Sequence, residues 1–339
     1  MPEPTTVALV LGGGGARGYA HIGVLEVLEE RGYQVVAIAG TSMGALVGGL
    51  HAAGARQAYA DWACGLTQRD VLRLLDPTIR GPGAIRANKI FAKVTELLGD
   101  VRIEDLPVPY TAVATDLLAG KEVWFQHGPL APAIRASIAL PSFITPVMLD
   151  GRLLADGGML NPIPVAATVA ANADLTVAVS LSEEHVTGHG SVTTTASADP
   201  RPTATTDPAR PEPAQLLDSE LVRAVTSWFG GFRDTGAATS TPNDDADTPD
   251  PVDASLREFV DGTGLGAPPP GLRMIDVMQL SLDALQGAVT RYRLAGYPPD
   301  VLVTIPRTAC RTLDFHRAEE LIALGRRRAE AALERDTDR

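Results

Sequence analysis

The hydrophobic and polar positions near the start of the chain follow two alternating patterns. Short β-branched runs at residues 6–11 (TVALVL) and 34–40 (QVVAIAG) predict buried strands. Each run is followed by apolar residues at helical spacing, which predict helices over residues 19–32 and 42–54. A strand, a glycine loop, a helix, a strand, a tight turn and a helix make a βαβα unit, which implies a parallel sheet with helices on both faces.

The same patterns continue through most of the remaining chain. Further helices are predicted over residues 57–98 (broken at 76–84), 128–141, 164–173, 272–296 and from about 315. Further strands are predicted at residues 110–125 (two strands around a turn), 151–156, 175–181 and 300–306. The predicted fold class is α/β, with three layers and a mostly parallel central sheet between helices. We expect one such domain, built from residues 5–182 plus 271–335.

Residues 183–270 have a different composition, rich in Pro, Thr and Asp and poor in apolar residues. Such a segment cannot bury enough surface to offset the entropy of ordering, so we predict a largely disordered insertion. Residues 215–232 within it predict an amphipathic helix, which either packs on the domain or acts as a lid or interfacial helix. Its apolar residues near one face are Leu216, Leu217, Leu221, Val225, Trp228 and Phe229.

Charge and cysteine content narrow the function class. The 339 residues carry a formal charge of −12, of which −10 falls in residues 183–270 (15 acidic and 5 basic residues). The rest is nearly neutral, which argues against a nucleic-acid partner. Two distant cysteines favour a reduced compartment. We see neither a signal peptide nor a run of about 20 apolar residues, and we expect a cytoplasmic protein, with peripheral membrane contact left open.

The glycine loop after the first strand contains the GxGxxG pattern of Gly13, Gly15 and Gly18. A dinucleotide-binding fold would place an acidic residue at the end of the second strand to bind ribose. That strand instead ends in AGTSMG, without an acid, and no Gly-Lys-Ser/Thr follows the glycines, so the P-loop reading also fails. The loop therefore needs another role.

The second strand ends in a GxSxG motif formed by Gly40, Ser42 and Gly44. Between a buried strand and a helix, this motif is typical of a nucleophile elbow, although a plain tight turn is the alternative. Acyl transfer needs N–H donors for the tetrahedral oxyanion, and the neighbouring glycine loop could supply them. The candidate oxyanion-hole residues are Gly13, Gly14, Gly15 and Arg17, and Arg17 has the alternative roles of anchoring the loop or binding a phosphate head group.

A nucleophilic serine also needs a general base. Among the six histidines, only His316 lies late enough in an ordered segment to complete a Ser-Asp-His order. The other candidate is Asp156, which ends a predicted strand and precedes Gly157 and Gly158. Active-site residues gather at the carboxyl ends of strands in such sheets, although Asp-Gly-Gly is also a common β-turn. The residues alone leave both bases open.

The blocks GGGGARG, GTSMG, IRASIALPSFITPV and DGGMLNPIP, in this order, resemble the patatin-like phospholipases. The resemblance covers residues 7–182 and, more weakly, 271–325. It implies a serine–aspartate dyad without histidine, in which Ser42 is the nucleophile and Asp156 the base. It also implies an oxyanion hole in the glycine loop, and structural roles for Asn161 and Pro164. The long insertion departs from the family pattern.

The predicted function is that of a serine acyl hydrolase that cleaves carboxylic esters of lipids through an acyl-enzyme, of the phospholipase A, lysophospholipase or esterase type. We expect no cofactor and no metal ion, because no His, Cys and Asp residues cluster at ligand spacing. Two alternatives stay open: a non-catalytic lipid-binding or regulatory protein on the same fold, and a histidine-dependent α/β-hydrolase that uses His316. The sequence leaves the acyl chain, the head group and the oligomeric state undetermined.

Overall fold

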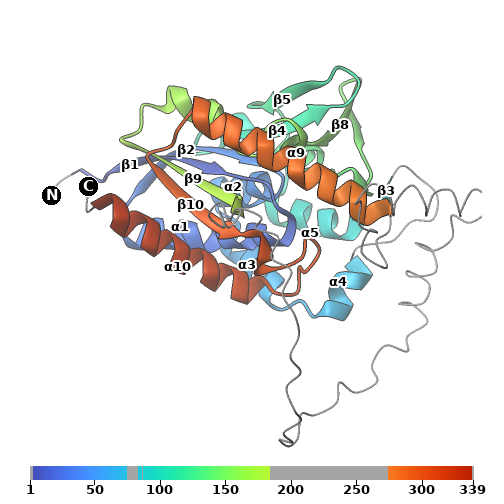
Figure 1. Ribbon diagram of the computed structural model, residues 1–339, viewed down its shortest axis with the longest axis horizontal. Helices are drawn as coiled ribbons and strands as arrows, with labels where there is room; N and C mark the ends of the chain where they lie inside the picture. Colours follow the sequence, from blue (N-terminus) through green and yellow to red (C-terminus); the bar gives the residue numbers. More distant parts are fainter. Residues whose placement is uncertain (1–2, 75–82, 86, 184–273, 338–339) are drawn as a thin grey trace, which may run out of the picture. The chain divides into compact units, whose positions relative to one another are not determined.

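The chain folds into a central sheet with helices around it in the computed structural model, which describes residues 3–74, 83–85, 87–183 and 274–337 (Figure 1). The strands are β1 (Thr6–Leu11), β2 (Gln34–Thr41), β3 (Gly83–Ile85), β4 (Tyr110–Asp116), β5 (Lys121–Phe125), β6 (Ser142–Ile144), β7 (Val147–Leu149), β8 (Arg152–Asp156), β9 (Leu175–Glu183) and β10 (Val301–Pro306). The α-helices are α1 (Ala20–Glu30), α2 (Met43–Ala52), α3 (Arg56–Cys64), α4 (Gln68–Leu74), α5 (Asn88–Leu98), α6 (Leu130–Ser137), α9 (Met274–Gly296) and α10 (Ala318–Thr337). Short 3-10 helices are η1 (Gly15–Tyr19), η2 (Ile103–Asp105), η3 (Gly157–Met159), η4 (Val165–Ala171) and η5 (Arg307–Ala309).

The central sheet has the strand order β10-β9-β1-β2-β4-β8-β7, and β5 also pairs with β4. Strands β10, β9, β1, β2 and β4 run parallel, whereas β5, β7 and β8 are joined to it by antiparallel pairing. The three-layer α/β class is confirmed, with a mixed sheet whose parallel part lies around β1 and β2. Outside this sheet, β3 and β6 form a short parallel pair.

Alternate residues of β1 point to opposite faces of the sheet, because the side-chain period of a strand is two. Leu9 and Leu11 are fully buried in the main core, which also holds residues of α1, α2 and α10. Val10 instead packs with Ile163 and with Val165 of η4, and Leu294 of α9 joins that second cluster. The sheet is therefore covered on both faces, as its continuously apolar central strands require.

The predicted insertion lies outside the described residues, apart from Glu183, which ends β9. The same is true of the predicted amphipathic helix at residues 215–232. The boundaries of the insertion and its role as a lid or interfacial helix stay predictions.

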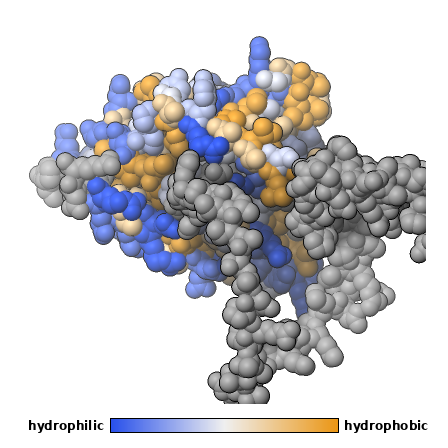
Figure 2. Space-filling view, in the orientation of Figure 1, coloured by the Kyte–Doolittle hydropathy of each residue, from blue (hydrophilic) through white to orange (hydrophobic). Residues whose placement is uncertain are grey.

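One side of α9 exposes apolar side chains, and hydrophobic residues gather over this helix in Figure 2. The exposed large side chains of α9 are Val277, Met278, Leu280, Leu285 and Tyr292. The opposite side of the helix contributes to the pocket described below. Among the described helices, none has the length and hydropathy needed to span a bilayer.

Candidate active site

Ser42 occupies a sharp turn between β2 and α2. Its backbone has φ 56° and ψ −124°, a strained conformation for a residue with a side chain, and the residue is 8% exposed. The turn requires the two flanking glycines: a Cβ atom on Gly44 would collide with the Leu11 carbonyl oxygen, and one on Gly40 would collide with the Gly44 backbone. This is the geometry of a nucleophile elbow, with the serine at the N-terminus of a helix.

Asp156 ends β8 and meets Ser42 along one edge of β4. Thr41, the last residue of β2, pairs with Val113, and the next residue of β4, Ala114, pairs with Asp156. The other edge of β4 is occupied by β5, so β2 and β8 lie end to end on one edge of β4, and Ser42 and Asp156 meet where these two strands end. Asp156 is the last residue of its strand, as the sequence predicted, but β8 runs antiparallel to β4 and therefore reaches this point from the direction opposite to β2.

The Asp156 carboxyl group is held in a nearly dry environment, with only 2% of the residue exposed. Burial raises the pKa of Asp156 to about 6, while hydrogen bonds from the Ser42 hydroxyl and the Gly158 N–H act in the opposite direction. The Gly158 bond measures 2.7 Å to Asp156 Oδ1. Gly157 must lack a side chain, because a Cβ there would collide with the Val113 carbonyl oxygen.

The glycine loop passes directly beside Ser42. A Cβ placed on Gly13 would lie 3.3 Å from the Ser42 Cβ, so the loop backbone borders the serine. However, the Gly13 N–H donates to the Pro162 carbonyl at 3.0 Å. The prediction of Gly13 as an oxyanion donor is therefore corrected: its N–H is already used to fasten the loop. Gly18 has a packing role, since a Cβ there would collide with Met43.

The next two residues of the loop have free N–H groups. In the described part of the chain, no acceptor binds the N–H of Gly14 or Gly15, whereas the Ala16 N–H donates to the Thr312 carbonyl at 2.9 Å. Gly15 has φ 58°, a left-handed conformation that favours glycine. Two adjacent unpaired N–H groups beside a serine are the arrangement that an oxyanion hole requires.

Arg17 fastens this loop and also faces the pocket. Its Nε donates to the Gly14 carbonyl at 3.0 Å, and the residue is only 8% exposed. Burial lowers the pKa of Arg17, while the nearby Asp283 carboxylate favours its charged form. Arg17 thus anchors the predicted oxyanion loop and adds positive charge to the pocket wall.

The four described histidines lie outside the pocket lining: His21, His51, His127 and His316. His316 sits just before α10, without a contact to Ser42 or Asp156 in the described structure. His21 is fully buried, which lowers its pKa to about 4, so its ring is neutral near pH 7. Its Nε2 lies 2.8 Å from the Gly12 carbonyl, so His21 supports the glycine loop by donating to it.

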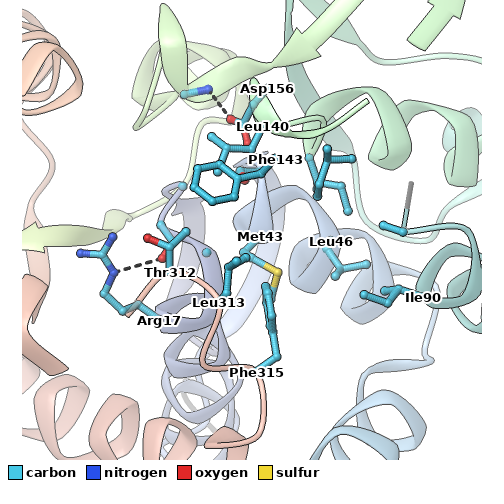
Figure 3. Close-up of a pocket in the computed structure, with 18 of the residues that line it drawn as sticks. Arg17, Met43, Leu46, Ile90, Leu140, Phe143, Asp156, Thr312, Leu313 and Phe315 are labelled. Atoms are coloured by element: carbon cyan, nitrogen blue, oxygen red, sulfur yellow. Dashed lines mark hydrogen bonds between the residues drawn. The ribbon is translucent and has the colours of Figure 1, made fainter. Parts of the chain in front are cut away.

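Ser42 and Asp156 open onto one large, mostly apolar pocket (Figure 3). Figure 3 places Asp156 at one end of the pocket, Arg17 at one side and Ile90 on the other. The pocket contains about 1230 Å³ of space that is continuous with solvent. Its apolar walls include Met43, Leu46, Trp62, Phe91, Leu140, Phe143 and Phe315.

Residues from the end of the chain form part of this pocket, a role that the sequence analysis did not predict. They are Leu282, Asp283 and Gln286 of α9, and Thr312, Leu313 and Phe315 before α10. The signal was weak because these residues lie in ordinary amphipathic or loop sequence, more than 100 residues after Asp156.

The loop after Asp156 is tied to three other elements. Asn161 accepts a hydrogen bond from the Thr41 hydroxyl on its backbone carbonyl (2.8 Å) and donates from Nδ2 to Glu122 (2.9 Å). Arg293 of α9 forms an ion pair with Glu122 and donates to the Leu160 carbonyl at 3.2 Å. These contacts hold the loop in place, in keeping with the structural role that the resemblance implies for Asn161. In the same described part of the chain, no group of three or more His, Cys, Asp or Glu residues lies close enough to hold a metal ion.

Comparison with known proteins gives a consistent family assignment. The family model described as patatin-like phospholipase matches residues 9–169. An uncharacterized NTE family protein of Mycobacterium tuberculosis is 51% identical over 332 residues, which cover 97% of this chain and 91% of that protein. Human patatin-like phospholipase domain-containing protein 6 is 36% identical over 190 residues, 54% of this chain and 14% of that protein. Neuropathy target esterase sws of Drosophila persimilis is 36% identical over 166 residues, 47% of this chain and 12% of that protein.

The mycobacterial relative matches almost the whole length of both chains, and the family model spans the segment that carries the glycine loop, the GxSxG turn and Asp156. This chain is a member of the patatin-like phospholipase family.

Proposed function

We propose that this protein is a lipid acyl hydrolase that cleaves carboxylic esters with a Ser42–Asp156 dyad. The observation that carries the proposal is the meeting of a strained, buried serine and a buried carboxyl of raised pKa at one end of an apolar pocket. The names of the relatives, a phospholipase domain and an esterase, support ester hydrolysis as the reaction class.

In the proposed first half-reaction, the Asp156 carboxylate accepts the proton of the Ser42 hydroxyl as the oxygen attacks the ester carbonyl. The N–H groups of Gly14 and Gly15 donate to the oxyanion that forms, and the positive end of α2 adds to its stabilisation. The tetrahedral intermediate then collapses. Its C–O bond to the alcohol breaks, and the alcohol leaves with the proton from Asp156.

The second half-reaction repeats these steps with water. Asp156 accepts a proton from the water, which attacks the acyl group on Ser42, and the same N–H groups stabilise the second oxyanion. Collapse breaks the bond to Ser42 Oγ, which recovers its proton from Asp156. A base with a pKa of about 6 is well matched to this task, because it is ionised at neutral pH and still basic enough to take a proton.

The pocket supports an ester with a long apolar acyl group as substrate. Its walls are mainly aliphatic and aromatic, and burial of each methylene of a chain contributes about 0.8 kcal/mol of binding free energy. Arg17 places one positive charge near the reacting end. We therefore expect short water-soluble esters to be accepted but poorer substrates than lipid esters.

Covalent capture tests the proposal directly. We expect purified protein to hydrolyse p-nitrophenyl esters and to be inactivated by a fluorophosphonate with a stoichiometry of about one label per chain, because a single activated serine attacks the phosphorus. Mass spectrometry should place the label on the peptide that contains Ser42. Hydrolysis that continues after full labelling, or a label on another serine, would contradict the dyad.

The pH dependence follows from the raised pKa of Asp156. Only the ionised carboxylate can accept the Ser42 proton, so kcat/KM should rise about tenfold per pH unit below about pH 6 and level off above it. The profile is measured from pH 4.5 to 8.5 at the isosbestic wavelength of p-nitrophenol, with each sample assayed again at pH 7.5 to exclude inactivation. A profile that is flat between pH 5 and 7 would argue against Asp156 as the base.

A binding protein on the same fold remains the second candidate, because a fold does not guarantee activity. The filled dyad positions favour the enzyme, and so do the N–H groups of Gly14 and Gly15, which have no acceptor within the ranges that the structure describes. Absence of both hydrolysis and labelling in the folded protein would favour the binding protein.

A further inference from the structure

Ser137 contacts the backbone of the proposed nucleophile and is absent from the pocket lining. It is the last residue of α6, and it is fully buried. Its Oγ accepts a hydrogen bond from the Ser42 N–H at 2.9 Å. The same hydroxyl donates to the Val113 carbonyl at 2.6 Å. One side chain therefore joins the backbone of Ser42 to the backbone of β4.

The sharp turn at Ser42 creates the need for this contact. The pairing of β2 with β4 ends at Thr41 and Val113, because Ser42 leaves the strand with φ 56°. A donor on Ser42 and an acceptor on Val113 are then left on neighbouring strands without a direct bond between them. Buried backbone groups of this kind are almost always paired. The Ser137 hydroxyl fills the gap, since it accepts from one strand and donates to the other.

The Val113 carbonyl that accepts a hydrogen bond from the Ser137 hydroxyl also lies next to the backbone of the proposed base, Asp156. Val113 precedes Ala114, which pairs with Asp156, and the Val113 oxygen packs against Gly157, where a Cβ would collide with it. Ser137 thus fixes Ser42 to the segment of β4 that also pairs with Asp156, on the same edge of the strand. A shift of Ser42 relative to this segment would change the position of its hydroxyl relative to the Asp156 carboxylate.

We propose that Ser137 is a positioning residue of the dyad: its hydroxyl holds the strained Ser42 backbone at the distance from Asp156 that proton transfer requires. The inference rests on the proposed function. It assigns no contact with the substrate to Ser137, so its removal should affect the chemical step and leave substrate binding unchanged.

The test compares Ser137→Ala with wild type in steady-state hydrolysis of a p-nitrophenyl ester and in the rate of fluorophosphonate labelling. Misplacement of reacting groups by about 1 Å can cost on the order of 100-fold, so we expect kcat to fall about 10- to 100-fold. The labelling rate should fall by a similar factor, because attack of Ser42 on the phosphorus also requires proton transfer to Asp156. KM should stay within about twofold of wild type, since Ser137 lies outside the pocket.

Thr168→Val is the matched control. Thr168 is 4% exposed, and its hydroxyl donates to the Val165 carbonyl at 2.9 Å in η4, away from the dyad. The Thr168→Val substitution removes a buried hydroxyl, as Ser137→Ala does, and we expect it to lower Tm and to leave kcat unchanged. Should Ser137→Ala fail to fold, Ser137→Thr and Ser137→Cys replace it: Thr keeps the hydroxyl and should retain more kcat than Cys, whose thiol is a weak hydrogen-bonding group.

The outcomes separate this inference from the proposed function. If Ser137→Ala lowers Tm as Thr168→Val does but keeps kcat within about twofold, or if the Thr and Cys variants have equal kcat, the positioning role is overturned. If wild type neither hydrolyses the ester nor takes the label at Ser42, the proposed function itself fails.

Discussion

Replacement of Ser42 by alanine is expected to lower kcat for ester hydrolysis by about 10⁴-fold or more, because loss of a catalytic serine nucleophile removes the covalent pathway altogether. The fluorophosphonate should no longer label the protein. The fold should tolerate the change, since the hydroxyl is removed from an 8% exposed position and the backbone N–H keeps its partner on Ser137. The measurement is steady-state hydrolysis of a p-nitrophenyl ester, supported by the Tm of each variant.

His316→Ala is the control for this experiment. His316 lies outside the pocket lining, so its replacement should leave kcat within about twofold of wild type. A large loss of kcat in a folded His316→Ala variant would instead support the histidine-dependent alternative. Residual activity in Ser42→Ala close to that of wild type would show that another residue, or a contaminating esterase, performs the reaction.

Replacement of Asp156 by asparagine is expected to affect activity and stability in opposite directions. General base catalysis contributes about 10²- to 10⁴-fold, so kcat should fall by that factor. The free energy of unfolding at pH 7.5 should rise, because the native state holds an ionised carboxylate in a nearly dry site. The amide keeps the size of the side chain and can still accept the Gly158 N–H.

The sign of the stability effect follows from proton linkage. Between pH 3.8 and about 6 the native state retains the Asp156 proton while the unfolded chain releases it, so the stability of wild type falls as pH rises through this range. Each unit of pKa shift corresponds to about 1.4 kcal/mol. Above pH 6, the raised pKa of Asp156 therefore lowers the free energy of unfolding of wild type by roughly 3 kcal/mol. Asparagine does not titrate. The advantage of Asp156→Asn over wild type should therefore be present at pH 7.5 and shrink towards pH 4.

Urea unfolding of wild type and Asp156→Asn at pH 7.5 and pH 4 measures this difference. Asp283→Asn is a suitable control, because Asp283 is half-buried and already paired with Arg307, and it should show no comparable gain. An Asp156→Asn variant that is less stable than wild type at pH 7.5 would indicate that the carboxylate is stabilised in the fold, in conflict with a raised pKa.

The chemistry-bearing residues could be identified from the sequence because each lies in a short local motif. GxSxG, the glycine loop and Asp-Gly-Gly require small residues at fixed positions, and collisions at Gly40, Gly44 and Gly157 explain why. The sequence could not predict which N–H groups of the glycine loop are available to bind an oxyanion. Which N–H groups are free depends on acceptors from distant segments: Pro162 accepts the Gly13 N–H, while the Gly14 and Gly15 N–H groups have no acceptor among the described residues.

The α/β pattern, the turn at Ser42 and the family could all be predicted from the sequence, because periodicity and short motifs reflect local backbone geometry. Three features became visible in the folded structure alone: the antiparallel direction of β8, the pocket walls supplied by α9 and by the residues before α10, and the hydrogen bond from Ser42 to Ser137. The short strands β3, β6 and β7 also escaped prediction, since three residues are too few to show a period. The direction of a strand in the sheet depends on which other strands it pairs with, and the pocket depends on contacts between residues about 100 positions apart. Both are decided by packing and hydrogen bonds between distant segments, which no local sequence pattern specifies.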